Sequence, residues 1–168
     1  VRLNPQIRTG TGGLVKNILI CATQRSGSTM LIEDMRNTGV MGAPEEWFVP
    51  WSIEKPNINW ENAFEGVMRR ASGENGCRAI KLMANQLAPV NECLSTFMTS
   101  RLDGLFPIVA EAFKDWVFFK LTRRDTVSQA ISRVMSRQTG INHATGSADD
   151  THFAGNLKKG YDPSYNSE

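Results

Sequence analysis

A loop of small hydroxyl residues with one arginine is the segment of this sequence best suited to chemistry. It reads Thr23-Gln24-Arg25-Ser26-Gly27-Ser28-Thr29. Serine and threonine hydroxyls and an arginine guanidinium are donors that suit phosphate and sulfonate oxygens. Gly27 permits a backbone conformation, or a close approach, that a side chain would block. If a helix begins after this glycine, its first N–H groups and its dipole also attract an anion.

The flanking residues predict that this loop joins a strand to a helix. Residues 17–22 form a short apolar run, which is typical of a strand buried on both faces. From Ser28 onward the apolar residues follow helical spacing, and Gly39 is a natural helix end. A serine-capped helix after a tight turn is the competing interpretation. The loop alone does not decide between that structure and an anion site.

Two common phosphate-binding patterns are excluded. The loop of ATPases and GTPases has a lysine before its serine or threonine and an earlier glycine at a fixed spacing, and both are missing here. The phosphatase pattern also fails, because Gly27 follows Cys21 at the position where an arginine is required. The cysteines Cys21, Cys77 and Cys93 have no CxxC spacing, which argues against a disulfide framework and a zinc site. They are expected to be small buried side chains in a reducing compartment.

A second group of anion-binding residue types follows a predicted strand at 116–121. It contains Arg123 and Arg124, and the next predicted helix carries Ser128 and Ser132 four residues apart on one face. Open α/β sheets bind ligands beyond the carboxyl ends of their strands. These residues are therefore candidates for holding a second phosphate group. The alternative is a surface arginine pair beside solvated serines.

The remaining pattern predicts an α/β fold with a parallel sheet, because strands and helices alternate along the chain. Another strand is expected at 77–83, helices are expected at 62–70 and 105–114, and the stretch 42–60 should be irregular with short helices. A last helix is expected after Asp125. Its apolar residues have the spacing of a helix packed on one face: Val127, Ala130, Ile131, Val134 and Met135.

Length and composition indicate one ordinary domain. Its predicted strands and helices lie within residues 17–139, after a polar tail at 1–16, and residues 140–168 are expected to be a polar, poorly ordered or truncated segment of the same domain. The chain has 168 residues, of which 40% are hydrophobic, and its formal net charge is +2. That charge is too small to indicate nucleic acid as a partner. No apolar run approaches 18 residues, so no transmembrane segment is expected and the location is predicted to be cytoplasmic.

Four segments together resemble the bacterial trehalose 2-sulfotransferase family and related lipopolysaccharide sulfotransferases. Residues 22–31 resemble the family's 5′-phosphosulfate loop, and residues 42–48 resemble the segment with its proposed catalytic glutamate. Residues 79–86 resemble its Lys-Leu-Met strand, and residues 123–132 resemble its 3′-phosphate segment. The four matches occur in family order, and any one alone would be weak.

The resemblance implies a P-loop-like parallel sheet flanked by helices, incomplete at its C-terminal end, since the family continues beyond this length. It implies 3′-phosphoadenosine 5′-phosphosulfate as donor, a carbohydrate or glycolipid hydroxyl as acceptor, and no metal. The 5′-phosphosulfate would be bound by Gln24, Arg25, Ser26, Gly27, Ser28 and Thr29, with Arg25 also catalytic. The 3′-phosphate would be bound by Arg123 and Ser132, together with Arg124 and Ser128.

Two residues outside these loops complete the expected site. The resemblance assigns the general base to Glu46, which would contact the acceptor hydroxyl, while a solvated loop carboxylate is the alternative for Glu46 and for Glu45. Lys81 either reaches the sulfonate or extends from a strand end to solvent. Trp47, Trp51 and Trp60 are expected in the core rather than in an acceptor cleft. His143 and His152 are expected to have no catalytic role.

Other functions remain open from the sequence. One is a nucleotide-binding remnant of the same fold without catalysis. A small kinase with an atypical phosphate loop is less favoured, because the lysine and serine or threonine pair is absent. A homodimer is one assembly compatible with the sequence.

Overall fold

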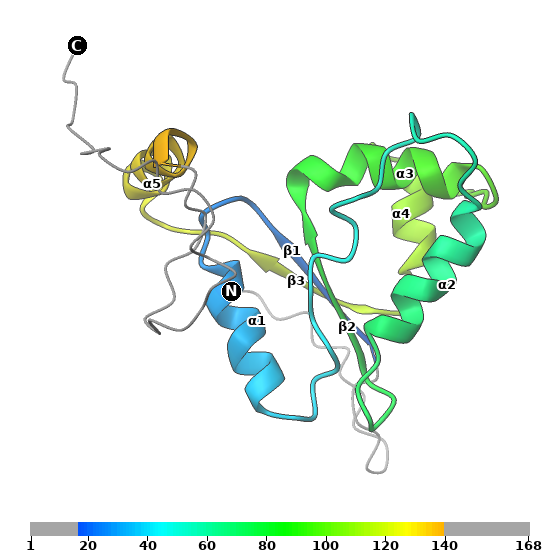
Figure 1. Ribbon diagram of the computed structural model, residues 1–168, viewed down its shortest axis with the longest axis horizontal. Coiled ribbons are helices and arrows are strands. Elements are labelled where there is room, and N and C mark those ends of the chain that lie inside the picture. The colour runs from blue at the N-terminus through cyan, green and yellow to red at the C-terminus, as the bar shows by residue number, and fades with distance from the viewer. Residues whose placement is uncertain (1–16, 140–168) are drawn as a thin grey trace.

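Three parallel strands form the centre of the computed structural model, which describes residues 17–139 (Figure 1). The strands are β1 (Asn17–Ala22), β2 (Arg78–Met83) and β3 (Val117–Leu121), in the order β2-β1-β3. In this register Leu19 lies opposite Ile80 on one side and Phe118 on the other. The predicted α/β class with a parallel, helix-flanked sheet is confirmed. The predicted segments 1–16 and 140–168, with His143 and His152, lie outside the described residues.

All three predicted strands are found, whereas the helices differ from the predicted set at two places. They are α1 (Ser28–Asn37), α2 (Trp60–Arg70), a 3₁₀ turn η1 (Ala84–Gln86), α3 (Leu87–Ser95), α4 (Pro107–Ala112) and α5 (Thr126–Thr139). The prediction of short helices within 42–60 is wrong, since only turns precede α2 there. Three prolines in this stretch remove backbone donors that a helix needs. Helix α3 was not predicted; Pro89 lies in its first turn, where a backbone N–H is not required.

The two faces of the sheet are covered by different helices, as Figure 1 shows. Helix α1 covers one face, where Ile32 and Met35 pack with Ile18, Ile20 and other sheet residues. Helices α2, α3 and α4 cover the opposite face, where Leu19 is buried. Because side chains alternate along a strand, a central strand covered on both faces must be apolar at almost every position. This explains the apolar run of β1.

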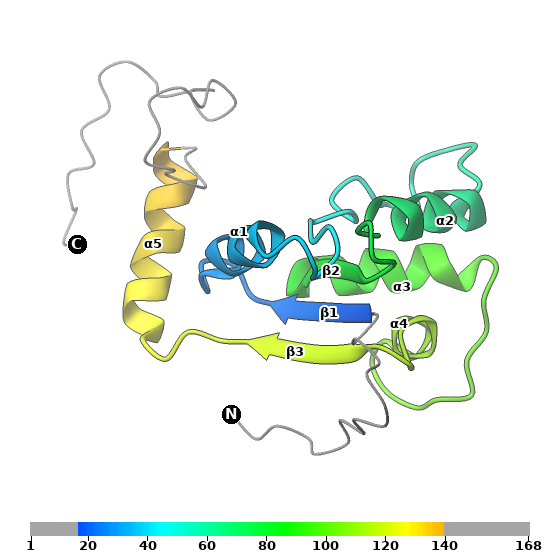
Figure 2. The same ribbon diagram turned by 90° about the horizontal axis from the view of Figure 1, so that it is seen from below.

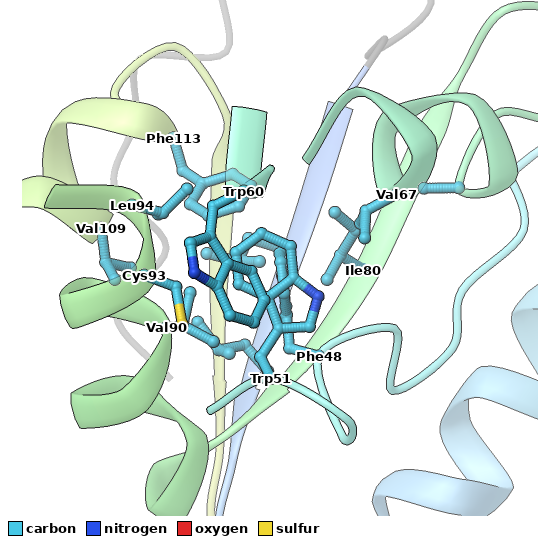
Figure 3. Packing of buried hydrophobic residues seen from close by; sticks show 13 residues of the cluster. Phe48, Trp51, Trp60, Val67, Ile80, Val90, Cys93, Leu94, Val109 and Phe113 are labelled. Atoms are coloured by element: carbon cyan, nitrogen blue, oxygen red, sulfur yellow. The ribbon is translucent and has the colours of Figure 1, made fainter. Parts of the chain in front are cut away.

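Aromatic side chains fill the larger core, between the sheet and helices α2, α3 and α4 (Figure 3). The Phe48 ring meets the Trp51 indole edge-on, with 4.9 Å between ring centroids, and Trp51 lies 5.0 Å from Trp60. Trp51 is 6% exposed and Trp60 is 7% exposed, so both belong to the core as predicted, while Trp51 also lines the cleft at the carboxyl ends of the strands. Trp47 packs partly against the same core, and its indole N–H donates to the Ala43 carbonyl.

Helix α5 stands beyond the carboxyl ends of β1 and β3, away from α2, α3 and α4 (Figure 2). Its existence was predicted, but the expectation that its apolar stripe is packed is wrong. Val127 is 69% exposed and Val134 is 52% exposed, and Ile131 and Met135 are exposed as well. The physical reason is that β3 is an edge strand of the described sheet, with Phe118 also exposed, so α5 meets no packed face there. Among the described residues, no helix is long and apolar enough to cross a membrane.

The cysteine thiols offer a direct check on core burial. Cys77 and Cys93 are buried as predicted, whereas Cys21 is only partly buried; all three are free thiols. Burial, with a smaller contribution from the Glu92 carboxylate, raises the pKa of the Cys93 thiol to about 11. At pH 8 its reactive thiolate fraction is therefore roughly 10⁻³, against about a quarter for an ordinary cysteine.

We expect Cys93 to be alkylated by iodoacetamide on the order of 100-fold more slowly in the native chain than in the urea-unfolded chain at pH 8. The rate in the native chain should keep rising well beyond pH 9, because the thiolate forms only near the raised pKa. Mass spectrometry of the Cys93 peptide measures both rates. Equal rates in the native and unfolded chains would show that iodoacetamide reaches Cys93 on α3 in the native protein, and that this part of the core is not closed to solvent.

Candidate functional site

A cleft of about 930 Å³ opens where the carboxyl ends of the strands meet α1 and α5. Residues following all three strands line it, including Gln24, Gln86 and Arg123. This volume is in the range of sites that enclose a small organic ligand. Its charged lining consists of four arginines and two glutamates: Arg25, Arg123, Arg133, Arg137, Glu33 and Glu46. The excess of guanidinium groups favours an anionic ligand with more than one charged group.

The loop before α1 does not have the geometry of a helix start that is capped by a side chain. Gly27 precedes the helix with φ of 90°, and no side chain caps the first turn, which also lacks an acidic residue. A Cβ at Gly27 would meet no atom within 4 Å, so the glycine is needed for its backbone angle and not for space. Arg25 also has a positive φ, of 62°. The alternative of a serine-capped helix is therefore not the structure found.

Ser26 shows that the loop has unused hydrogen-bonding capacity. Within the part of the chain that the structure describes, its Oγ atom is buried and has no hydrogen-bond partner. A buried hydroxyl without a partner costs free energy, roughly 1–3 kcal/mol. Ser28, at the first position of α1, is buried too, with 5% exposure. An anion seated on the loop would supply an acceptor, although Ser26 is not among the residues that line the cleft.

Helix α5 holds the loop from the far side of the cleft. The Arg25 Nε donates to Ser132 Oγ at 2.7 Å. One turn earlier on the same helix face, the Gln129 amide donates to Thr23 Oγ1 at 3.0 Å and to the Gln24 carbonyl at 2.6 Å. The two predicted anion-binding groups are thus brought together. Gln129 was missed in the sequence, although its place three residues before Ser132 was a usable signal.

Only part of the second predicted group lines the cleft. Arg123 and Ser132 do, whereas Arg124 and Ser128 do not. Ser128 instead donates its backbone N–H to Asp125 Oδ1 at 2.9 Å. Hydrogen bonds from the Ser128 side chain and backbone, with Arg123 nearby, hold the pKa of the Asp125 carboxyl below its usual value. Ser128 therefore belongs to the start of α5.

Further along α5, the cleft is lined by three residues that were not predicted from the sequence: Arg133, Ser136 and Arg137. Arg133 and Arg137 are four residues apart, as are Ser132 and Ser136, so each pair shares a helix face. That repeated Ser-Arg spacing on a predicted helix was the signal available. The pairs extend the basic wall of the cleft by one helical turn beyond the residues that were predicted.

Of the two adjacent glutamates, Glu46 lies in the cleft wall and Glu45 does not. Glu45 forms an ion pair with Arg36, and its Oε2 accepts the Glu46 backbone N–H at 3.1 Å. Glu46 Oε1 lies 2.7 Å from Lys81 Nζ, and its Oε2 accepts from the Gln86 amide at 3.2 Å. Lys81 is 2% exposed and is not part of the cleft lining. It lies behind Glu46, which differs from both placements considered for it in the sequence.

The segment that carries Glu46 is fastened along the outer edge of β2. The Lys81 backbone N–H donates to the Glu45 carbonyl at 3.0 Å. The Ala43 N–H donates at the same distance to the Ala71 carbonyl, which also accepts the Ala79 N–H of β2 at 3.1 Å. Gly42 begins the segment with φ of 73°, and a Cβ there would lie 2.7 Å from the Ala79 nitrogen. A glycine is therefore needed both for the backbone angle and for the close approach to β2.

We expect Gly42→Ala to lower the free energy of unfolding by about 1–3 kcal/mol more than Gly76→Ala does. Gly76 also has a positive φ, of 75°, but a Cβ there meets nothing within 4 Å, so it controls for backbone strain. Urea denaturation of the two variants measures the difference. Equal losses would mean that β2 yields to the added methyl group without cost.

Among the described residues, no group of three or more histidine, cysteine, aspartate or glutamate side chains is arranged to hold a metal ion. The polar and charged side chains that line the cleft are arginines, hydroxyl residues, amides and the two carboxylates of Glu33 and Glu46. Positive charge at this cleft thus comes from guanidinium groups and from the start of α1.

Comparison with known proteins gives one consistent result. The family model described as Stf0 sulphotransferase matches residues 17–168. A trehalose 2-sulfotransferase from Mycobacterium tuberculosis (strain ATCC 35801 / TMC 107 / Erdman) is 30% identical, over 76% of this chain and 59% of the relative. One from Mycolicibacterium smegmatis (strain ATCC 700084 / mc(2)155) is 29% identical, over 73% and 57%. The chain thus spans less than two thirds of the length of these relatives.

Proposed function

Because the chain belongs to the Stf0 sulphotransferase family, we propose that it transfers a sulfuryl group from 3′-phosphoadenosine 5′-phosphosulfate to a carbohydrate hydroxyl. The observation that carries the proposal is the cleft. Glu46 and Arg25 both line it, and Arg25 belongs to the loop at residues 23–29, called the anion loop from here on. Since two relatives are named trehalose 2-sulfotransferases, trehalose is the first acceptor to test. A glycolipid bearing the same kind of hydroxyl is the second.

The anion loop is the proposed site of the donor's 5′-phosphosulfate end. Two observations support the fit: the buried Ser26 hydroxyl lacks a partner, and the first turn of α1 has no side-chain cap. Backbone N–H groups at the start of α1 would complete the contacts. Five of the contacts predicted from the sequence line the cleft and are proposed here: Gln24, Arg25, Gly27, Ser28 and Thr29. Ser26 belongs to the same loop but does not line the cleft, and its contact remains a prediction from the sequence.

The donor's 3′-phosphate is proposed to bind along the α5 wall. Arg123 and Ser132 line the cleft there and are the first choice. Arg133 and Arg137 extend the same wall and are within the proposal for the same reason. Arg124 and Ser128 remain predictions from the sequence, which their placement outside the lining does not support.

The proposed reaction is an in-line transfer. The acceptor oxygen forms a bond to sulfur while the bond from sulfur to the bridging phosphate oxygen breaks, leaving adenosine 3′,5′-bisphosphate. Glu46 accepts the proton of the attacking hydroxyl. Arg25 and the loop N–H groups stabilise negative charge on the transferred group and on the leaving phosphate.

Differential ligand stabilisation tests donor binding. Adenosine 3′,5′-bisphosphate should raise Tm of the 168-residue chain more than ATP does at equal concentration. The reason is that it carries phosphate at both the 3′ and the 5′ position of the ribose, whereas ATP carries phosphate at the 5′ position alone. A ligand at 100 times its Kd stabilises by about 2.7 kcal/mol, which is readily measured. A larger shift with ATP would favour the kinase alternative and overturn the proposal.

Transfer of ³⁵S-labelled sulfate from the donor to trehalose and a panel of other sugars tests catalysis. Labelled product establishes the enzyme. Bisphosphate binding without transfer to any acceptor would instead establish the non-catalytic alternative.

A further inference from the structure

We propose that Lys81 and Gln86 act as a carboxylate clamp, two positioning residues that fix Glu46 in the orientation from which it accepts the proton. The clamp rests on the proposed function. The two side chains of this ion pair differ in how far they are exposed to solvent. The Lys81 side chain is 3% exposed, whereas the Glu46 side chain is 27% exposed. The cation thus lies inside the protein and the carboxylate faces the cleft.

The position of Lys81 follows from the alternation of side chains along β2. Ile80 and Leu82 point into the aromatic core, so Lys81 points to the opposite face with Ala79. A buried ammonium is costly unless a counter-charge accompanies it. Glu46 supplies that charge at 2.7 Å. The strand therefore ties the carboxylate to a rigid part of the sheet.

Gln86 holds the second carboxylate oxygen, and its amide has a defined orientation. Its Oε1 accepts the Met83 backbone N–H at 3.0 Å, and its Nε2 donates to Glu46 Oε2 at 3.2 Å. A flipped amide would place an NH₂ group against a backbone donor and an oxygen against a carboxylate. Both contacts would become repulsive. Gln86, 6% exposed, is therefore locked with its donor toward Glu46.

Among residues 17–139, each Glu46 oxygen then has one donor. A carboxylate oxygen can accept a second hydrogen bond, and the partial exposure of Glu46 leaves that position on the cleft side. Gln86 also lines the cleft, while Lys81 does not. Lys81 can therefore influence transfer through Glu46 without touching the donor or the acceptor.

A double-mutant cycle separates this role from a merely structural one. Lys81→Met and Gln86→Met should each lower kcat about 10–100-fold, with KM for the donor changed less than about twofold. In the Glu46→Gln background neither substitution should lower kcat further, because the residue through which both act has lost its function. The same fold loss in both backgrounds would overturn the clamp.

Lys114→Met is the matched control. Lys114, exposed in the turn that follows α4, pairs with Glu111 of that helix at 2.9 Å, and its substitution should leave kcat unchanged in both backgrounds. The bisphosphate-induced rise in Tm is measured for every variant, so that an unfolded chain is not mistaken for an inactive one. If Lys81→Met does not fold, Gln86→Met alone still decides, because it removes no charge.

Failure of the clamp and failure of the proposed function give different results. Full activity of Lys81→Met and Gln86→Met beside an inactive Glu46→Gln overturns the clamp alone. Full activity of Glu46→Gln overturns the assignment of the base and the clamp with it. Absence of sulfate transfer by the unsubstituted chain overturns the proposed function and any catalytic consequence of the clamp.

Discussion

Replacing Glu46 with glutamine is expected to lower kcat for sulfate transfer about 10²–10⁴-fold. Glutamine keeps the shape of the side chain and an oxygen that can face Lys81, but it cannot accept the acceptor's proton. Because Glu46 is not part of the anion loop, the rise in Tm caused by adenosine 3′,5′-bisphosphate should persist. Initial rates with labelled donor and saturating acceptor measure the loss.

Glu45→Gln supplies the comparison with a neighbouring carboxylate. Glu45 is paired with Arg36 outside the cleft, and a glutamine still offers an oxygen to the Glu46 N–H. We expect this variant to lose less than about tenfold in kcat. A larger loss of kcat in Glu45→Gln than in Glu46→Gln would show that Glu45, and not Glu46, is the general base.

The second large effect is expected at Arg25. Removing its guanidinium in Arg25→Met should raise KM for the donor on the order of 10–100-fold, because hydrogen bonds to charged groups each contribute about 1.5–3 kcal/mol. The variant also loses the 2.7 Å contact with Ser132, so the loop and α5 are less firmly joined. Bisphosphate titrations followed by Tm measure the loss independently of turnover.

Arg78→Met is the control for general loss of positive charge. Arg78 is exposed at the first residue of β2, at the end of the sheet away from the cleft. Its substitution should leave the bisphosphate-induced shift unchanged. If Arg25→Met retained the full shift as well, the anion loop would not be the site of the 5′-phosphosulfate.

The sequence predicted the elements whose signals are local. The apolar run of β1, the change to helical spacing at Ser28 and the glycine before it are contained within a few residues, and each was found as expected. The anion loop could be proposed for the same reason. The resemblance to a family, rather than residue spacing, indicated Glu46 as the general base. The position of Glu46 in the cleft wall supports that assignment.

Features that depend on distant residues could not be predicted. The ion pair of Lys81 with Glu46 joins two segments that only the edge of β2 brings together. The spacing of apolar residues on α5 predicted a helix correctly, but periodicity does not reveal whether a packed surface lies opposite. Val127 and Val134 are therefore exposed despite their helical spacing.

The contacts between α5 and the anion loop have a consequence for the order in which the protein folds. Arg25 and Ser132 are 107 residues apart, and Gln129 is 106 residues from Thr23. Contacts so distant in sequence are slow to form, since the intervening chain must first be ordered. During synthesis, β1, the loop and α1 leave the ribosome long before their partner helix. Bisphosphate added during refolding should therefore bind only in the slowest phase, when α5 docks and the cleft is completed.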